Sequence, residues 1–300
     1  MSVRPLYVFA VITAALLAGF TGRVDAETPN FMMELTVGGE RIEGRPLNWS
    51  KSRVVLLGRD GRLHEFHPSR AKDFRKTGPR FESYSASRFR ADLLRELGPG
   101  FEVTATGHYV VAHPAGERDR WGQRFEHLYR SFLRYFRVRG FELDEPPVPL
   151  VAVVLRDQSE FQRYAAMHGE HVSPGVLGFY SPESNRVALY DLDGDREIEA
   201  AWHETAGTII HEATHQSAFN TGVHSRMLRP PLWVAEGLGT LFEAKGIWDS
   251  ATYRDPRERL NRGRLDDFQR YARTRRRPGT LLEIVGTDDL FRRNPMAAYA

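Results

Sequence analysis

Two histidines four residues apart, His211 and His215, constrain this chain more than any other feature of its sequence. At this spacing two residues of an α-helix lie about 40° apart around the axis and about 6 Å apart along it. Both imidazoles can therefore reach one metal ion from the same face. Glu212 lies about 100° further round than His211, where its carboxylate can face a water molecule beside the ion without binding the ion itself. A pair of buried core histidines is the alternative.

The residues on both sides of the motif favour the metal site. Upstream, apolar side chains recur at helical spacing, namely Ile198, Ala201, Trp202, Ile209 and Ile210. Downstream, Pro230-Pro231 precedes Leu232 to Leu238, a pattern that predicts a second helix with proline near its first turn. Glu236 follows His215 by 21 residues, an interval long enough for a loop and a return to the motif helix. We therefore expect two histidines and Glu236 to bind Zn²⁺ and to leave a fourth position for water.

In this chain the motif residues are His211-Glu212-x-x-His215 and Trp233-x-x-Glu236-Gly237. They resemble the motif of the gluzincin metallopeptidases. In that group the third zinc ligand is a glutamate on the helix after the motif, which implies this role for Glu236 and the role of general base for Glu212. Glu243 matches a further glutamate of many gluzincins. The resemblance implies that Glu243 accepts a hydrogen bond from a ligand histidine. A solvated carboxylate on the helix surface is the alternative reading of Glu243.

A narrower resemblance is carried by four segments, 178–182, 185–191, 211–226 and 233–240. They resemble the bacterial peptidase-MA-like family of unknown function numbered 1570. The resemblance extends from about Phe31 to the end of the chain and is most specific between Gly175 and Glu243. The chain departs from it at Gly239, where alanine is expected. It also stops at Ala300, where such families continue into a long helix. We therefore expect the natural sequence to extend further.

The resemblance implies two more parts of the site. Gluzincins usually supply a tyrosine or histidine from beyond the third ligand, and it hydrogen-bonds the oxyanion formed during catalysis. Tyr299 is the candidate, Tyr253 and Tyr271 are weaker rivals, and an aromatic residue in a terminal segment is the alternative. Gluzincins also pair an edge strand with extended substrate. Either Gly175–Tyr180 or Arg186–Tyr190 can be that strand.

The N-terminus predicts export. Arg4, the apolar stretch from Leu6 to Phe20 and the ending Val24-Asp25-Ala26 have the three regions of a secretory signal, with cleavage expected after Ala26. The apolar run is short for a membrane span, so we expect no stable span after cleavage. The chain has no cysteine and therefore neither disulfides nor a lipoprotein anchor. The expected location is the periplasm, the cell surface or the medium.

Composition and patterning divide the chain into segments. Its 42 basic and 39 acidic residues nearly balance, which gives no case for nucleic acid as a partner. We expect a signal peptide at 1–26, a small β-rich unit at 27–80, a helical linker at 81–100 and the catalytic domain at 101–300. In the β-rich unit, Val54 to Leu63 is the clearest hairpin, and the unit resembles the small SH3-like barrels.

The expected fold is α+β: a zincin-like metallopeptidase domain, with a mixed sheet and the motif helix, preceded by the small β-unit. The expected function is that of an exported zinc-dependent metallohydrolase, most simply a peptidase acting on a peptide or protein substrate. The alternative is a secreted binding protein, associated with the cell envelope, that keeps a structural zinc site without catalysis. Glu212 favours the enzyme, because a purely structural site has no use for a base.

Overall fold

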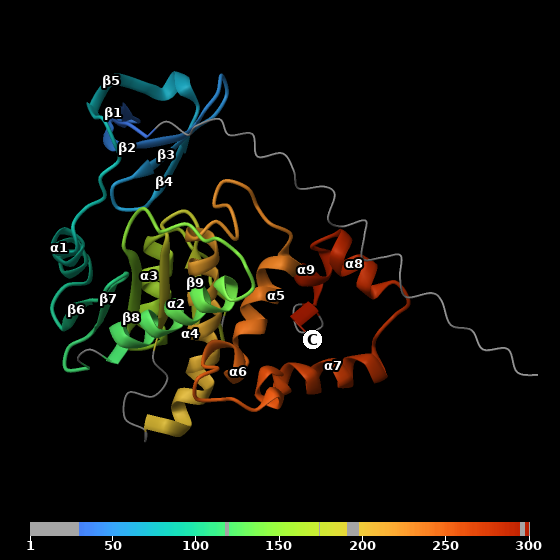
Figure 1. Cartoon of the computed structure of the whole chain (residues 1–300). Coiled ribbons are helices and arrows are strands. Elements are labelled where there is room, and N and C mark those ends of the chain that lie inside the picture. Colours follow the sequence, from blue (N-terminus) through green and yellow to red (C-terminus); the bar gives the residue numbers. More distant parts are fainter. Residues whose placement is uncertain (1–29, 118–119, 174, 191–197, 295–297, 300) are drawn as a thin grey trace, which may run out of the picture.

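The structure is a computed structural model that describes residues 30–117, 120–173, 175–190, 198–294 and 298–299 (Figure 1). The predicted signal at 1–26 lies outside these residues. The fold mixes α-helices with two five-stranded sheets, as the expected α+β class requires. Among the described helices, none is both long and apolar enough to cross a bilayer.

The first sheet is antiparallel throughout, in the order β4-β3-β2-β1-β5. Its strands are β1 Met32–Val37, β2 Glu40–Trp49, β3 Val54–Gly58, β4 Leu63–Phe66 and β5 Ala71–Gly78. A 3-10 helix, η1 (Pro68–Arg70), joins β4 to β5. The hairpin predicted from Val54 to Leu63 is confirmed as β3 and β4. Apolar residues on the inner face form a small core that includes Leu35, Val54 and Leu56.

The second sheet has the order β6-β7-β8-β10-β9. Its strands are β6 Phe101–Ala105, β7 Tyr109–Pro114, β8 Leu150–Leu155, β9 Gly178–Ser181 and β10 Arg186–Tyr190. β8 is parallel to both β7 and β10, whereas β6 and β9 at the edges are antiparallel to their neighbours. All six residues of β8 are apolar and buried, because helices cover both faces of this sheet.

Four helices form these two covering layers: α1 Ala86–Leu97, α2 Arg120–Arg137, α3 Gln158–Met167 and α4 Ile198–Asn220. α2 and α4 pack on one face of the second sheet, where they meet Val111, Ala152 and Val154. α1 and α3 pack on the other face, where Phe89 and Phe161 lie in the core. The segment expected to be a linker therefore contains a helix that belongs to the core of the second sheet.

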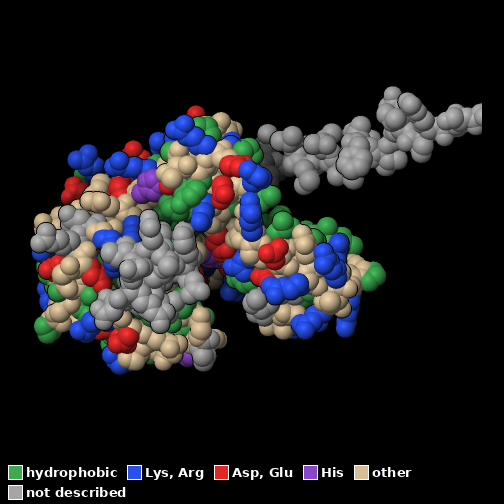
Figure 2. Space-filling model, turned by 90° about the horizontal axis from the view of Figure 1, so that it is seen from below, with side chains coloured by type: hydrophobic (Ala, Val, Ile, Leu, Met, Phe, Trp, Pro, Cys, Tyr) green, Lys and Arg blue, Asp and Glu red, His purple; other side chains and the backbone are tan. Residues whose placement is uncertain are grey.

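The described chain beyond α4 is mainly helical, and its last helices lie on the right in Figure 1. It comprises α5 Leu232–Phe242, α6 Lys245–Trp248, the 3-10 helix η2 Pro256–Arg259, α7 Arg262–Thr274, α8 Thr280–Gly286 and α9 Asp289–Arg293. Seen from below, these C-terminal helices form a lobe on which acidic and basic side chains are interspersed (Figure 2).

Hydrogen bonds from Leu63 and Arg226 join the first sheet to the second. The backbone N–H of Leu63 donates to the carbonyl of Glu183 at 2.8 Å, in the turn between β9 and β10. The Arg226 guanidinium, in the loop after α4, donates to the carbonyls of Gly61, Pro182 and Glu183. The β-rich unit is thereby held against the loop that follows the motif helix.

Candidate metal centre

Helix α4 carries both motif histidines toward one side. His211 and His215 are each 8% exposed, and their ring centroids are 4.7 Å apart. The opposite face of α4 is anchored to the second sheet, because the Gln216 amide donates to the carbonyls of Val151 at 3.0 Å and Asn185 at 2.8 Å. This buried anchor fixes the rotation of the helix and thus the direction of both imidazoles.

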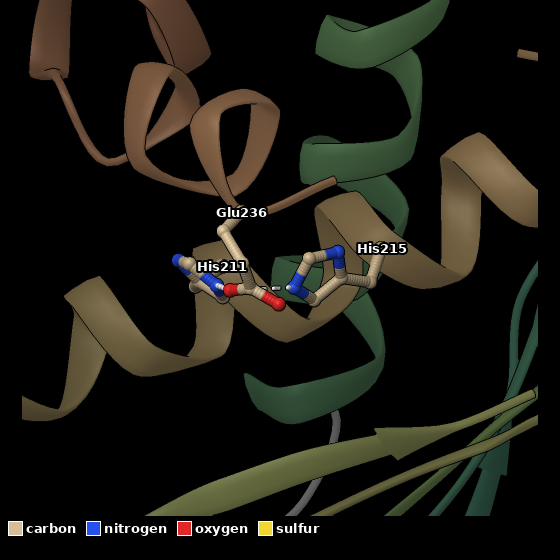
Figure 3. Close-up of side chains that lie close together, drawn as sticks. All are labelled: His211, His215 and Glu236. Atoms are coloured by element: carbon tan, nitrogen blue, oxygen red, sulfur yellow. Dashed lines mark hydrogen bonds and ion pairs between the residues drawn. The ribbon is translucent and has the colours of Figure 1, made fainter. Parts of the chain in front are cut away.

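Glu236 comes from the second helix, α5, and its carboxylate lies between the two imidazoles (Figure 3). Its Oε2 is 3.0 Å from Nε2 of His211 and 3.6 Å from Nε2 of His215. One ligand atom from each of the three residues lies within 4.8 Å of the other two. This largely buried group can bind a metal ion.

Glu243 contacts the ring nitrogen of His211 that does not face Glu236. Its Oε1 accepts a hydrogen bond from Nδ1–H of His211 at 2.8 Å, the contact that the resemblance implies for it. The same carboxylate accepts hydrogen bonds from the Asn261 amide at 2.7 Å and from the Arg264 guanidinium. Glu243 is thus no solvated surface carboxylate. It fixes the ring orientation of His211 and directs Nε2 at Glu236.

The electrostatics fit a divalent cation. Burial by itself lowers the pKa of His211, but the hydrogen bonds to Glu236 and Glu243 outweigh it and raise this pKa to about 10. Burial by itself raises the pKa of Glu236, yet the two imidazoles bring it far below its ordinary value. The two carboxylates therefore hold positive charge at Nε2 of His211. A cation bound there would take the place of that proton, while Nδ1–H keeps its bond to Glu243.

Tyr299 borders the same space, and the charge of the Glu212 carboxylate acts on both Tyr299 and His211. The Tyr299 hydroxyl donates to Oε2 of Glu236 at 2.7 Å, and its ring centroid lies 6.2 Å from that of His211. Burial and the Glu236 carboxylate raise the pKa of Tyr299, with a smaller contribution from Glu212, so the phenol keeps its proton. The rivals lie elsewhere: Tyr253 packs against Trp248, and Tyr271 borders a pocket between α7 and Asn294.

Gly239 is a site residue whose reason the sequence did not reveal. A Cβ atom at this position of α5 would lie 2.6 Å from Cε1 of His211, which is closer than side chains approach one another. The absence of a side chain at Gly239 therefore makes room for the imidazole. This close approach is a structural reason for glycine at position 239, where the resemblance predicts alanine.

The sheet order settles which strand is at the edge. β10 lies between β8 and β9, so Arg186–Tyr190 is an interior strand. β9 is the edge strand, and in the described part of the chain its outer side has no strand partner. β9 also lies beside the motif helix, because Tyr180 stacks on Phe219 with ring centroids 5.6 Å apart.

The comparison with known families covers this site. Residues 205–300 match the family described as "Protein of unknown function (DUF1570)". The match confirms the resemblance to that family over the part of the chain that contains the three candidate ligands. It also includes Glu212, Glu243 and Tyr299. No curated protein matches the chain.

Proposed function

We propose that this protein is an exported zinc-dependent peptidase of the gluzincin type, and that its second sheet and C-terminal helices form a zincin-like domain. The observation that carries the proposal is the position of Glu236. It reaches across from α5 to both motif histidines, with Oε2 3.0 Å from His211, and so brings two imidazoles and one carboxylate together. This donor set is that of catalytic zinc sites of the His₂Glu type.

His211, His215 and Glu236 would hold the ion. When bound, Zn²⁺ lowers the pKa of a water molecule and polarises the carbonyl group of the bond to be cleaved. In the proposed mechanism the Glu212 carboxylate takes the proton of the attacking water and passes it to the leaving amine. Tyr299 holds its hydroxyl proton beside Glu236, where it can donate to a carbonyl oxygen that becomes negatively charged.

The edge strand supports a proposal for the substrate class. An extended polypeptide can add to the free side of β9 through backbone hydrogen bonds, which are independent of its side chains. Because Tyr180 of β9 stacks on Phe219, one helical turn after His215, a strand added there would run along the side of α4. We therefore propose a peptide or an unfolded protein segment as substrate.

Glu212→Gln tests the proposal. The change keeps the size of the side chain and removes the base, so metal content and melting temperature should remain at the wild-type level while cleavage of a peptide library falls by about 10² or more. Equal cleavage by wild type and variant would exclude Glu212 as the base. A wild-type protein that holds zinc and cleaves nothing would instead favour the non-catalytic binding protein. N-terminal sequencing of the exported protein tests the signal, with Glu27 expected as the first residue.

A further inference from the structure

A second, strongly basic pocket lies away from the metal centre, between the C-terminal half of α2 and the segment from Gly246 to Arg259. Its volume is about 380 Å³. The acidic and basic side chains that line it are those of His127, Arg130, Arg134, Arg139, Asp249 and Arg259. Four arginines thus face the pocket against one carboxylate.

Two of these arginines are held in place by the protein itself. Arg130 donates to Glu126 at 2.8 Å. Arg139 donates to the carbonyl of Tyr135 at 2.7 Å, and its guanidinium carbon is 3.6 Å from the centre of the Tyr135 ring. Arg134 and Arg259, by contrast, form no ion pair with a carboxylate among the described residues. The pocket therefore has two guanidinium groups whose hydrogen-bonding capacity is available to a ligand.

The gathering of these charges requires an explanation. Basic residues near the end of α2 interact favourably with the helix dipole, which accounts for Arg134. That argument does not extend to Arg259, which belongs to η2 and comes to the pocket from a distant part of the sequence. Like charges from two separate elements repel one another, and the single carboxylate of the pocket, Asp249, offsets only part of this repulsion. The arrangement is one that an anionic ligand stabilises.

We propose that this pocket binds a phosphate or sulfate ester. Guanidinium groups form paired, charge-assisted hydrogen bonds with the oxygens of a tetrahedral oxyanion. The volume exceeds what a single small anion needs, and Tyr135, Val138 and Ile247 provide an apolar wall for the organic part of an ester. Val138 is 70% exposed, so the wall is accessible. The proposal is independent of peptidase activity, because none of the metal-site residues lines this pocket.

The test is calorimetric titration of the full mature protein with inorganic phosphate, inorganic sulfate and phenyl phosphate, all at the same ionic strength. We expect saturable binding of one phenyl phosphate per chain, tighter than that of either inorganic ion. The tighter of the two inorganic ions identifies which ester is favoured. Arg134→Ala combined with Arg259→Ala should weaken binding about tenfold or more, with unchanged melting temperature because both side chains are exposed.

The matched control is Arg137→Ala combined with Arg262→Ala. It removes the same charge from α2 and from the start of α7, outside the pocket, and should leave binding unchanged. Equal weakening of anion binding by the two double variants would overturn the proposal, because the effect would then depend only on the overall charge of the protein. The proposal is also overturned if none of the three anions gives saturable binding, whether or not a hexaglutamate peptide binds.

Discussion

Replacing Gly239 by alanine should favour helix α5 and at the same time displace the His211 ring from its position in the candidate metal site. The new Cβ would lie 2.6 Å from Cε1, 2.7 Å from Nε2 and 2.8 Å from Nδ1 of His211, whereas ordinary contacts begin at 3.4 Å. The ring must therefore withdraw by about 0.8 Å. It is not free to do so, because Glu243 and Glu236 hold its two nitrogens at 2.8 and 3.0 Å.

Two effects of opposite sign follow from this substitution. Alanine in place of glycine favours a helix by about 1 kcal/mol, whereas displacing the His211 ring weakens its hydrogen bonds to Glu236 and Glu243, so the metal-free variant should gain less stability than Gly237→Ala. Displacement of His211 should lower zinc affinity about 10-fold to 100-fold, the range found when the support of a metal ligand is disturbed. Competition with a chromophoric chelator measures the affinity, and differential scanning calorimetry measures the stability.

Gly237→Ala is the matched control for this experiment. It lies in the same helix, and a Cβ there would meet nothing within 4 Å. The control should gain helix stability and keep wild-type zinc affinity. If Gly239→Ala binds zinc as tightly as Gly237→Ala, the close approach to His211 does not govern the site and the reasoning is refuted.

Three further substitutions probe separate parts of the chain. Glu236→Ala should reduce zinc from about one ion per chain to a small fraction, because two protein ligands remain; full occupancy measured by plasma mass spectrometry would require a different third ligand. Tyr299→Phe should lower kcat by about 10² to 10³ with zinc retained, and an unchanged kcat would remove Tyr299 from the catalytic site. Glu126→Gln tests a structural network: burial by itself raises the pKa of Glu126, but hydrogen bonds from His108, Thr106 and Arg130 lower it to about 2. The ionised carboxylate therefore stabilises the fold fully above its ordinary pKa of 4.5 and loses this contribution as pH falls toward about 2. Urea unfolding should show a loss of about 2 kcal/mol at pH 7 and a smaller difference between the two proteins at pH 3; a loss that does not change with pH would contradict this account.

The motif helix and the helix after it could be predicted because their signals are local. Apolar residues at helical spacing before His211 predict α4, and Pro231 before Leu232 predicts the start of α5. The distance between His211 and His215 then follows from helix geometry alone. That Glu236 approaches both rings is a tertiary result, and the sequence predicts it because the 21 residues from His215 to Glu236 allow a loop and a return and because the motif resembles that of the gluzincins.

Other parts of the site depend on pairings that a single sequence does not encode locally. Nothing in Gly175–Tyr180 or Arg186–Tyr190 shows which of the two strands pairs in parallel with β8, and that pairing decides which one lies at the edge. The partners of Glu243 are similar. Asn261 and Arg264 follow it by 18 and 21 residues, and no periodic pattern connects them to the motif helix.

The position of Glu243 links the metal centre to a helix that contributes no ligand. Asn261 caps the start of α7, since its side chain accepts a hydrogen bond from the backbone N–H of Arg264, and both residues also hold Glu243. Order at the start of α7 and the orientation of His211 are therefore thermodynamically coupled. Such coupling is reciprocal: zinc should slow hydrogen exchange at the first turn of α7, and any partner that clamps this turn should tighten zinc binding by the same factor.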